Sequence, residues 1–387
     1  MNYLVISAHD YRSRRKAGLH FITAELAKRG QTRFFSCQYS LLSDLKSDPR
    51  KSIGALANKR EVFDGVECYL WKTLIHPFNM RKPVLQPIES FLFRRYLRHV
   101  SPVLVEWIKQ SDMVVFESGI APIFFDLVLE LNPRARTVYV ASDDLATINV
   151  ASYVKHTFDR IAPQMDALCL KSRFMIDGIP PSDNQYIVPH GFDFSVADHA
   201  DPSPYGPGQH AVSLGSMLFD PSFFVIASKL FPEMTFHVIG SGMGRHEGYG
   251  SNVIVYDEMP HKQTLPYIKH ATIGLAPYRA AGLPAYLSDT SLKLMQYDFF
   301  GLPAACPQAI VGDYQSRFGY VPGNEQSIGD AIRAARAAPR VTFRTPLAWS
   351  DVVDRILSPD SFPDTQVPSS GRRNLDAAGS RYTPLPA

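Results

Sequence analysis

The sequence predicts an α/β protein built from two parallel-sheet domains, and three observations support this fold class. The chain has 387 residues, more than one hydrophobic core usually supports. It opens with a strand, a helix and a second strand, the pattern of a parallel sheet. A segment rich in Pro and Gly at residues 201–208 then separates this first run of elements from a second run that begins near residue 211.

The first run begins with an apolar strand at residues 3–7. A helix over residues 17–29 follows, Gly30 ends it, and residues 32–36 return as a strand. Short runs of apolar and β-branched residues predict further strands at 66–71, 113–117, 137–141, 168–170 and 186–190. These elements define a predicted N-terminal domain of residues 1–200.

The most amphipathic part of this domain is residues 87–110, which predict a basic helix. Its apolar residues fall near helical spacing and are Ile88, Phe91, Leu92, Tyr96 and Leu97. Its basic residues are Arg94, Arg95 and Arg98. A basic helix with aromatic residues can lie on an anionic membrane. A solvated charged face over an ordinary core stripe is the alternative.

The second run defines a predicted C-terminal domain of residues 206–345. Strands are expected at 211–215, 235–240, 253–256, 273–277 and 302–306. Helices are expected at 221–230, 263–270, 288–301, 327–337 and 349–357. Residues 359–387 are rich in Pro, Ser, Gly and Arg, which predicts a disordered tail.

Residues 288–307 predict a helix that leads into a short buried strand. Asp, Thr and Ser at positions 289–291 can all cap this helix, leaving its backbone N–H groups and positive dipole end available to an anion. Lys293 lies in the first turn, where a cation is unfavourable unless a negative group binds nearby. Gln296 shares roughly the same face. These features favour a diphosphate site, with an ordinary amphipathic helix as the alternative.

Composition narrows the classes of partner. Basic residues are concentrated in the first hundred positions, which favours a local anionic partner such as phospholipid or a lipid diphosphate. Nucleic acid ranks lower because no helix-turn-helix, zinc or RNA-binding motif accompanies these charges. The four cysteines form no CxxC pair, which argues against a metal site or a disulfide framework. With no signal-peptide pattern and no apolar run long enough for a spanning helix, we expect a cytoplasmic protein with at most peripheral membrane contact.

Polar or Gly-rich loops follow the strands of the second domain. They contain Met217, the segment 240–244, Glu258 and Tyr278. Such loops lie at one edge of a parallel sheet, and glycine lets the backbone approach a phosphate or ribose closely. The spacing of the glycines in 240–244 is wrong for a dinucleotide fingerprint, which excludes NAD. On these residues alone, Met217 also fits a core position and Tyr278 an ordinary loop aromatic.

The order of these motifs resembles the nucleotide-sugar domain of GT-B glycosyltransferases. More closely, the chain resembles the GumK family of glucuronosyltransferases of xanthan assembly, over about residues 3–357. The similar stretches include Ser7–Asp10, Val115–Ile120, Ala141–Asp143, Gly215–Pro221, His237–His246 and Tyr297–Pro303. The resemblance implies a GT-B fold, with two Rossmann-like domains facing a cleft and a closing helix at 346–358 that crosses back to the N-terminal domain.

The activity implied by this resemblance is an inverting transfer of glucuronate from UDP-glucuronate to a mannose-terminated oligosaccharide on a polyprenyl diphosphate, at the inner face of the membrane. Inversion requires a base that deprotonates the acceptor hydroxyl, and the family places it at Asp143. Asp144 follows where the family has glycine; it would raise the pKa of Asp143 or face solvent. The family needs no bound metal or other cofactor, which agrees with the lack of an Asp-x-Asp cluster.

The family also implies the residues that contact each substrate. The UDP contacts fall on Met217, Glu258, Tyr278, Lys293 and Gln296. Among them, Glu258 would accept hydrogen bonds from the ribose or uracil, and Lys293 would neutralise the leaving diphosphate. Acceptor contacts are expected at His9, Asp10 and Glu117, and membrane contacts at Arg94, Arg95 and Arg98. A buried structural role is the commoner fate of a lone histidine such as His20.

Three other functions stay open at this point. A transferase with another UDP-sugar or acceptor shares every motif above. A UDP-sugar epimerase shares the architecture but needs no basic helix facing a membrane. A catalytically inactive glycan-binding protein is disfavoured because Asp143 and Lys293 are retained.

Overall fold

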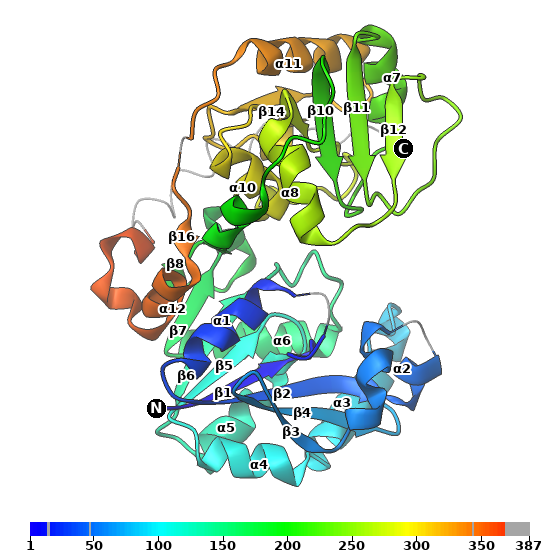
Figure 1. The fold of residues 1–387 in the computed structure, drawn as a ribbon. Helices are drawn as coiled ribbons and strands as arrows, with labels where there is room; N and C mark the ends of the chain where they lie inside the picture. Colours follow the sequence, from blue (N-terminus) through cyan, green and yellow to red (C-terminus); the bar gives the residue numbers. More distant parts are fainter. Residues whose placement is uncertain (14–15, 46–47, 343, 368–387) are drawn as a thin grey trace. The chain divides into compact units, whose positions relative to one another are not determined.

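The computed structural model describes residues 1–13, 16–45, 48–342 and 344–367. The chain divides into two compact units (Figure 1). Of the described residues, unit 1 holds those within 1–189 and 349–367, and unit 2 holds those within 190–348. Each unit contains its own mainly parallel sheet with flanking helices, which confirms the predicted α/β fold class. Unit 2 begins ahead of the linker segment expected at 201–208.

Within the described residues, the sheet of unit 1 has eight strands in the order β3-β4-β2-β1-β5-β6-β7-β8. Their bounds are β1 (Asn2–Ser7), β2 (Gln31–Ser40), β3 (Arg60–Phe63), β4 (Val66–Thr73), β5 (Met113–Glu117), β6 (Arg136–Ala141), β7 (Ala167–Leu170) and β8 (Gln185–Ile187). All neighbours are parallel except β3, which pairs antiparallel with β4 at the edge. The sequence did not predict β3, because its four residues are half charged and mostly exposed.

Helices pack on both faces of this sheet. Their bounds are α1 (Gly18–Ala27), α2 (Leu41–Leu45), α3 (Gln86–Arg98), α4 (Pro102–Lys109), α5 (Phe125–Leu131), α6 (Ser152–Ile161) and α12 (Trp349–Leu357). Phe34 of β2 contacts His20 of α1, and the next residue, Phe35, contacts Trp107 of α4. Because successive side chains of a strand point to opposite faces, α1 and α4 cover opposite faces of the sheet.

The helix predicted at 87–110 is two helices, α3 and α4. The break comes at Ser101, whose hydroxyl accepts a hydrogen bond from the Val103 N–H and caps α4, with Pro102 in the first turn. Proline disfavours helical backbone in the residue before it and is favourable at a helix start. The predicted apolar stripe is also divided, because Tyr96 is buried while Ile88 and Phe91 are exposed.

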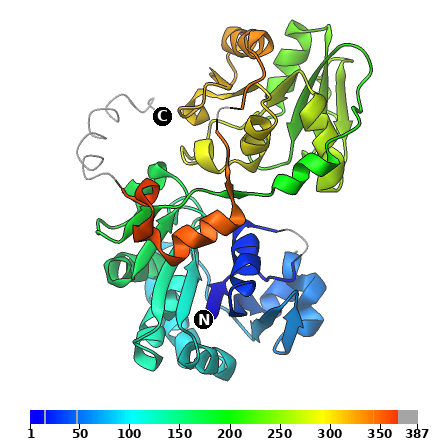
Figure 2. The same cartoon turned by 60° about the vertical axis from the view of Figure 1, so that its left-hand side comes forward.

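The last helix, α12, packs against α1 within unit 1 (Figures 1 and 2). Trp349 stacks on Phe21 with ring centroids 5.0 Å apart, and Asp354 forms an ion pair with Arg29 at 2.5 Å. This is the position expected for a closing helix that returns to the first unit. An apolar contact and an ion pair therefore hold α12 on α1. Composition alone does not predict this packing.

The prediction of disorder from residue 359 is wrong for residues 359–367. These residues form two short 3₁₀ turns, and the Tyr186 hydroxyl donates to the Asp360 carboxylate at 2.6 Å. Thr365 is fully buried, with its hydroxyl donating to the Pro359 carbonyl at 2.7 Å. A few well-placed anchors therefore outweigh a Pro- and Ser-rich composition. The remainder of the predicted tail, 368–387, lies outside the described residues.

The main sheet of unit 2, in the part of the chain that the structure describes, has six parallel strands in the order β12-β11-β10-β13-β14-β15. Their bounds are β10 (Gln209–Leu214), β11 (Met234–Ile239), β12 (Val253–Tyr256), β13 (Ile273–Leu275), β14 (Ala304–Pro307) and β15 (Arg317–Tyr320). A separate parallel pair joins β9 (Gly191–Phe192) and β16 (Leu347–Ala348). The helices are α7 (Ser222–Leu230), α8 (His261–His270), α9 (Leu287–Thr290), α10 (Leu292–Phe299) and α11 (Glu325–Ala337).

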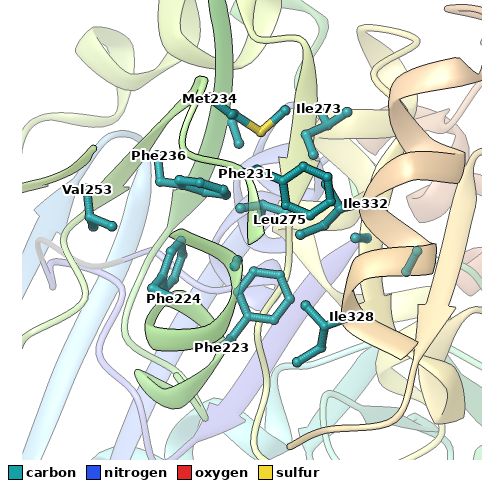
Figure 3. Close-up of a cluster of buried hydrophobic side chains, with 14 of the residues drawn as sticks. Phe223, Phe224, Phe231, Met234, Phe236, Val253, Ile273, Leu275, Ile328 and Ile332 are labelled. Atoms are coloured by element: carbon teal, nitrogen blue, oxygen red, sulfur yellow. The ribbon is translucent and has the colours of Figure 1, made fainter. Parts of the chain in front are cut away.

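An aromatic and aliphatic core fixes α7 and α11 on one face of this sheet (Figure 3). Phe223 and Phe224 come from α7, Phe236 from β11, and Ile328 and Ile332 from α11, and all five are buried. Truncating a phenylalanine in such a core typically costs about 3–5 kcal/mol of folding free energy. The core therefore holds the strand ends, and the loops that follow them, in fixed positions.

Helix α10 is fixed on the sheet by Tyr297. Its hydroxyl donates to the carbonyl oxygens of Val212, in β10, at 3.0 Å and of Leu275, in β13, at 3.1 Å. Gly274 makes room for this ring, because a Cβ atom there would lie 2.5 Å from the Tyr297 ring. The close approach sets the position of α10, and with it the first turn that carries Lys293.

Candidate active site

Polar side chains meet at the carboxyl edge of the unit 1 sheet. Glu117 ends β5, and its two carboxylate oxygens accept hydrogen bonds from the hydroxyl of Ser7, at the end of β1, and from that of Ser142, after β6, the latter at 2.9 Å. Lys171, after β7, donates to the Ser142 hydroxyl at 3.4 Å. Glu117 is only 1% exposed, so an acceptor contact through its carboxylate is not supported by the structure.

Asp143 lies next to this network and is half-buried. Its backbone N–H donates to the Ser118 hydroxyl at 3.0 Å, which fixes the start of the loop after β6. Burial lowers the pKa of Lys171, and the charges of Glu117 and Asp143 act in the opposite direction. Asp143 is therefore close enough to the buried ammonium for their charges to interact.

Asp144, which replaces the glycine of the family, uses its carboxylate within its own turn. One oxygen accepts a hydrogen bond from the Ala146 N–H at 2.8 Å, and the Asp144 carbonyl accepts one from the Thr147 N–H at 2.9 Å. The residue is half-buried rather than open to solvent. The Asp144 carboxylate therefore stabilises the turn in which it lies.

Asp10, predicted to contact the acceptor, is fully buried. Its carboxylate accepts two hydrogen bonds from the Arg12 guanidinium, both at 2.9 Å, and one from the Ser36 hydroxyl at 2.8 Å. Burial raises the pKa of Asp10, but the hydrogen bonds and charge of Arg12 outweigh it, and the pKa is lowered. An acceptor contact through Asp10 is not supported by the structure; its carboxylate instead holds the loop after β1.

The two histidines near this loop have different surroundings. The side chain of His9 is 57% exposed, and its Nε2 lies 4.0 Å from Oε2 of Glu117. His20 is buried, with Nε2 at 2.9 Å from the Asp10 carbonyl oxygen, and burial lowers the pKa of its imidazole. His20 therefore has the buried structural role expected of a lone histidine, whereas the ring of His9 is exposed to solvent at the sheet edge.

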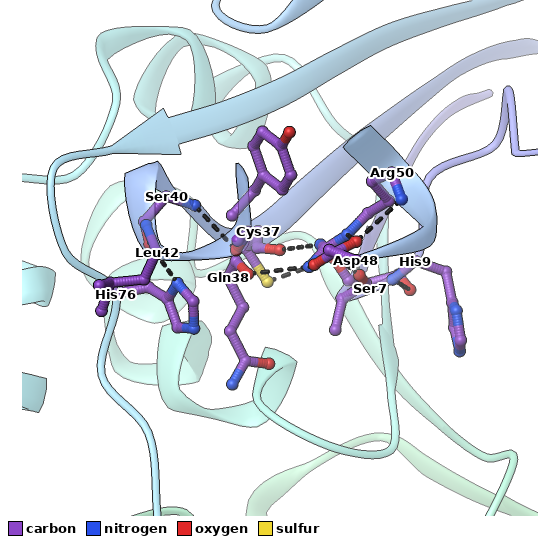
Figure 4. Close-up of polar contacts among 12 residues, drawn as sticks. Ser7, His9, Cys37, Gln38, Ser40, Leu42, Asp48, Arg50 and His76 are labelled. Carbon is purple, nitrogen blue, oxygen red and sulfur yellow. Dashed lines mark hydrogen bonds and ion pairs between the residues drawn. The ribbon is translucent and has the colours of Figure 1, made fainter. Parts of the chain in front are cut away.

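Arg50 supports the same loop and was missed by sequence reasoning (Figure 4). Its guanidinium donates to the carbonyl oxygens of Ala8 at 2.6 Å, Cys37 at 2.8 Å and Gln38 at 2.9 Å, and Asp48 pairs with it at 2.9 Å. These bonds tie the residue before His9 to the irregular end of β2. No local motif signals the three bonds to carbonyl oxygens, because Ala8, Cys37 and Gln38 lie 12 to 42 residues away in sequence.

The carboxyl edge of the unit 2 sheet is built from open loops. Gly215 and Gly240 have positive φ angles, 78° and 63°, which favour glycine. A Cβ atom at Gly240 would lie 3.5 Å from the Cα of Glu258, so the glycine loop passes close to that residue. Met217 is 55% exposed and Glu258 is exposed, which excludes a core position for Met217.

The first turn of α10 carries Lys293 at this edge. Ser291 caps the helix by accepting a hydrogen bond from the Leu294 N–H at 3.4 Å. Its hydroxyl lies 2.8 Å from that of Tyr278. Of the residues expected to cap, Asp289 and Thr290 instead belong to the separate helix α9, so the predicted single helix is divided at Ser291.

Lys293 lies over the ring of Tyr278, with Nζ 4.8 Å from the ring centroid. Burial lowers the pKa of Lys293 to about 7, and among the described residues no carboxylate forms an ion pair with it. Tyr278 is 2% exposed, and burial raises its pKa to about 12. The Tyr278 ring therefore packs against the ammonium group of Lys293. A direct contact between Tyr278 and a nucleotide stays a prediction.

Gln296 lies one turn beyond Lys293 and is half-buried. Its amide donates to Nε2 of His261, the first residue of α8, at 2.7 Å. His261 follows Glu258 by three residues, but no spacing in the sequence predicted that it would meet α10. The bond joins the start of α8 to the helix that carries Lys293.

No group of three or more His, Cys, Asp or Glu side chains within the described residues is placed to hold a metal ion. All four cysteines are buried and free. No helix in the described part of the chain combines the length and apolarity needed to span a membrane.

Comparison with known proteins identifies the family. Residues 5–171 match the family described as glucuronosyltransferase GumK, N-terminal domain. Over 365 residues the chain is 55% identical to UDP-glucuronate:glycolipid 2-beta-glucuronosyltransferase of Xanthomonas campestris pv. campestris, covering 94% of this chain and 91% of that relative. The chain belongs to the GumK glucuronosyltransferase family. The resemblance inferred from the motifs is thereby confirmed, and the GumK match favours a transferase over an epimerase.

Solved structures of lower sequence similarity share the fold. Sucrose-phosphate synthase from Thermosynechococcus elongatus matches with a TM-score of 0.59 at 11% identity, over 98% of this chain and 100% of that one. Anabaena HepE in complex with UDP-glucose matches with a TM-score of 0.57 at 10% identity, over 93% and 99%. At this identity the likeness concerns the fold alone, and it agrees with the GT-B fold of this family.

Proposed function

We propose that this GumK-family protein is an inverting glucuronosyltransferase. It moves glucuronate from UDP-glucuronate to a mannose-terminated oligosaccharide carried on a polyprenyl diphosphate, in exopolysaccharide assembly. The observation that carries the proposal is the 55% identity, over 94% of the chain, to a relative whose name specifies UDP-glucuronate and a glycolipid. The mannose and the polyprenyl diphosphate are inferred from the resemblance of the motifs to this family.

The donor is proposed to bind at the carboxyl edge of the unit 2 sheet. Lys293, in the first turn of α10, supplies a cation beside the positive end of a helix dipole, which suits the UDP diphosphate. Glu258 accepts from the ribose or uracil, and Met217 and Gln296 complete the contacts. As the bond to the sugar breaks, negative charge grows on the leaving UDP, and Lys293 stabilises it. No bound metal is part of this proposal.

The base is proposed to be Asp143 in unit 1. An inverting transfer needs one carboxylate that accepts the proton of the attacking hydroxyl. Asp143 is half-buried, and its loop is held by Ser118. His9, whose ring is exposed at the same sheet edge, is proposed to contact the acceptor sugar. Asp10 and Glu117 are buried, and their hydrogen bonds hold the loops at this edge.

The test is acceptor-dependent release of UDP from a panel of donors. With a lipid-linked, mannose-terminated acceptor, UDP-glucuronate should be consumed, whereas UDP-glucose and UDP-galactose should not. NMR of the product should show a β linkage, since inversion converts the α configuration of the donor. Excess chelator should leave the rate unchanged. Turnover with another donor alone would contradict the donor assignment and favour a transferase with a different UDP-sugar.

We also propose peripheral association with the anionic, cytoplasmic face of a membrane through α3. Val84, just before the helix, is 81% exposed, and Ile88 and Phe91 are 51% and 56% exposed. Arg94, Arg95 and Arg98 are exposed on the same short helix. Apolar side chains can insert at the interface while each basic residue adds about 1 kcal/mol of attraction to anionic lipid.

Vesicle sedimentation tests this surface. The variant R94E/R95E/R98E should lose binding to vesicles that contain phosphatidylglycerol. The matched control K109E/K229E/R333E makes the same change of net charge at exposed, scattered positions, and should still bind. Equal loss in both variants would mean that net charge, and not the surface of α3, governs the association.

A further inference from the structure

Lys171 is a buried cation that the proposed reaction does not yet use. It is 7% exposed at the end of β7, where an ammonium is costly unless hydrogen bonds and opposite charge compensate it. Its hydrogen bond goes to the hydroxyl of Ser142, the residue directly before Asp143. The compensating charges come from Glu117 and Asp143.

The groups around Lys171 form a closed network at the ends of four strands. Ser142 donates to Glu117, Glu117 also accepts from Ser7, and the Ser7 hydroxyl accepts from the His9 N–H at 2.8 Å. Glu117 and Ser7 are 1% and 0% exposed. Because these groups satisfy one another away from solvent, the network supports the sheet edge and does not itself contact a substrate.

Several other titratable groups face the same region. Tyr139 of β6 is fully buried, and burial together with nearby carboxylates raises its pKa well above the ordinary value, so it stays neutral at physiological pH. Asp144 is engaged in its own turn, and His9 lies 4.0 Å from Glu117. Lys171 is therefore a buried positive charge that acts on both Glu117 and Asp143.

We propose that Lys171 is a positioning residue for Asp143. Through its hydrogen bond to Ser142 it fixes the segment that carries the base, and its positive charge acts on the Asp143 carboxylate. Glu117 accepts a hydrogen bond from the same Ser142 hydroxyl, and its negative charge opposes part of the charge of Lys171. The inference rests on the proposed function of Asp143 as the base, and adds that a buried lysine and a buried carboxylate of opposite charge hold the segment that carries it.

The experiment measures how kcat/KM for the acceptor depends on pH in two variants with opposite expected shifts. Lys171→Met removes the positive charge, so the acid limb should move to higher pH by about one unit, and kcat on the plateau should fall about tenfold. Glu117→Gln removes the negative charge, so the acid limb should move to lower pH. The KM for UDP-glucuronate should be unchanged in both variants, since the donor contacts lie in unit 2.

Lys171→Arg keeps the charge and should keep the acid limb within a few tenths of a unit of the wild-type position. An unmoved limb in both charge-removing variants, or shifts of the same sign, would overturn the proposal. If thermal unfolding shows that Lys171→Met is not folded, the direction in which Glu117→Gln moves the acid limb still tests the proposal. Failure of the proposed function is separate, because it would appear as retained transfer in Asp143→Asn.

Discussion

The carboxyl edges of the two sheets handle charge in opposite ways. In unit 1 the charged groups are paired inside the protein: Asp10 with Arg12, and Glu117 with two hydroxyls and a nearby lysine. In unit 2 the loops are glycine-rich and exposed, and Lys293 has no carboxylate partner among the described residues. In unit 1 the charges are compensated without a ligand. In unit 2 the charge of Lys293 is left for an anionic ligand to compensate.

The difference follows from what each edge is proposed to do. A base must be held in one geometry throughout the reaction, and buried hydrogen-bonded pairs provide that rigidity. A donor site must bind UDP-sugar and then release UDP. A lysine whose pKa burial lowers to about 7 is unfavourable in the free protein and gains most when a diphosphate arrives. The comparison therefore predicts separable effects of mutations at the two edges.

The largest expected effect is that of Asp143→Asn. Loss of the base should lower kcat by about 10³-fold, while the affinity for UDP, measured by calorimetry, stays within about twofold of wild type. Asp144→Asn is the matched control; it removes the neighbouring carboxylate, which serves its own turn, and should keep most activity. A parallel loss of UDP affinity in Asp143→Asn would break the separation between the two edges.

Lys293→Met should act in the opposite manner. The affinity for UDP should fall about 100-fold, since a charge-assisted contact to the diphosphate is worth about 1.5–3 kcal/mol. The unliganded protein should become more stable at pH 7, because a half-buried cation without a carboxylate partner is replaced by an apolar side chain. Thermal unfolding with and without UDP measures both effects.

An exposed lysine serves as the control for that experiment. Lys229→Met, on α7, removes the same charge from the surface of unit 2 and should change neither quantity appreciably. A Lys293→Met protein that is destabilised as well as weakened in UDP binding would contradict the unpaired state assigned to this lysine.

The pH dependence of UDP binding sharpens the same point. Lys293 has a pKa of about 7 in the free protein, and a bound diphosphate should raise it, so binding takes up a proton above pH 7. The affinity should therefore fall by up to about tenfold per unit as pH rises from 7 to 9. The Lys293→Met variant should lose this dependence, and calorimetry at pH 7, 8 and 9 compares the two proteins.

The stability of the free protein should change in the opposite direction over this range. The folded pKa of Lys293, about 7, is below the ordinary value of 10.5, so the unfolded chain binds more protons between these pH values. The contribution of Lys293 to stability is therefore least favourable below pH 7 and improves as pH rises. A falling contribution would contradict the depressed pKa.

The positions of the candidate residues were largely predictable from sequence. Parallel strands bring their carboxyl ends to one edge, so sequence alone predicts the edge position of residues that end or follow a strand, such as Glu117, Asp143 and Glu258. The pairing of those residues could not be predicted in this way. The bond from Lys171 to Ser142 and the bond from Arg50 to Ala8 join residues 29 and 42 positions apart. Only the assembled sheet brings them together.

Two errors concern where a predicted helix is divided, and only the first had a clear signal in the sequence. Pro102 marks the break between α3 and α4, because the residue before a proline avoids helical backbone. Ser291 divides α9 from α10 in the same stretch where three consecutive residues could cap, and local sequence does not rank them. The order of residues 359–367 had no such signal, since it depends on contacts of Asp360 and Gln366 with Tyr186, which lies far away in the sequence.

The smallest expected effect is that of Ser291→Ala. The hydroxyl of Ser291 caps α10 and lies 2.8 Å from that of Tyr278. Its loss should cost about 1 kcal/mol of stability and leave a buried tyrosine hydroxyl without this bond. Because Lys293 lies in the same first turn and over the Tyr278 ring, UDP affinity should also fall, by about fivefold.

A second cap in unit 2 separates these two consequences. Asn324 caps α11 by accepting a hydrogen bond from the Ser327 N–H at 2.9 Å. Asn324→Ala should therefore cost a similar stability without changing UDP affinity, and Ser291→Thr should preserve both. If Asn324→Ala weakens UDP binding as much as Ser291→Ala does, the effect belongs to the stability of unit 2 as a whole. If only Ser291→Ala weakens UDP binding, the diphosphate binds at the first turn of α10, at the carboxyl edge of the unit 2 sheet.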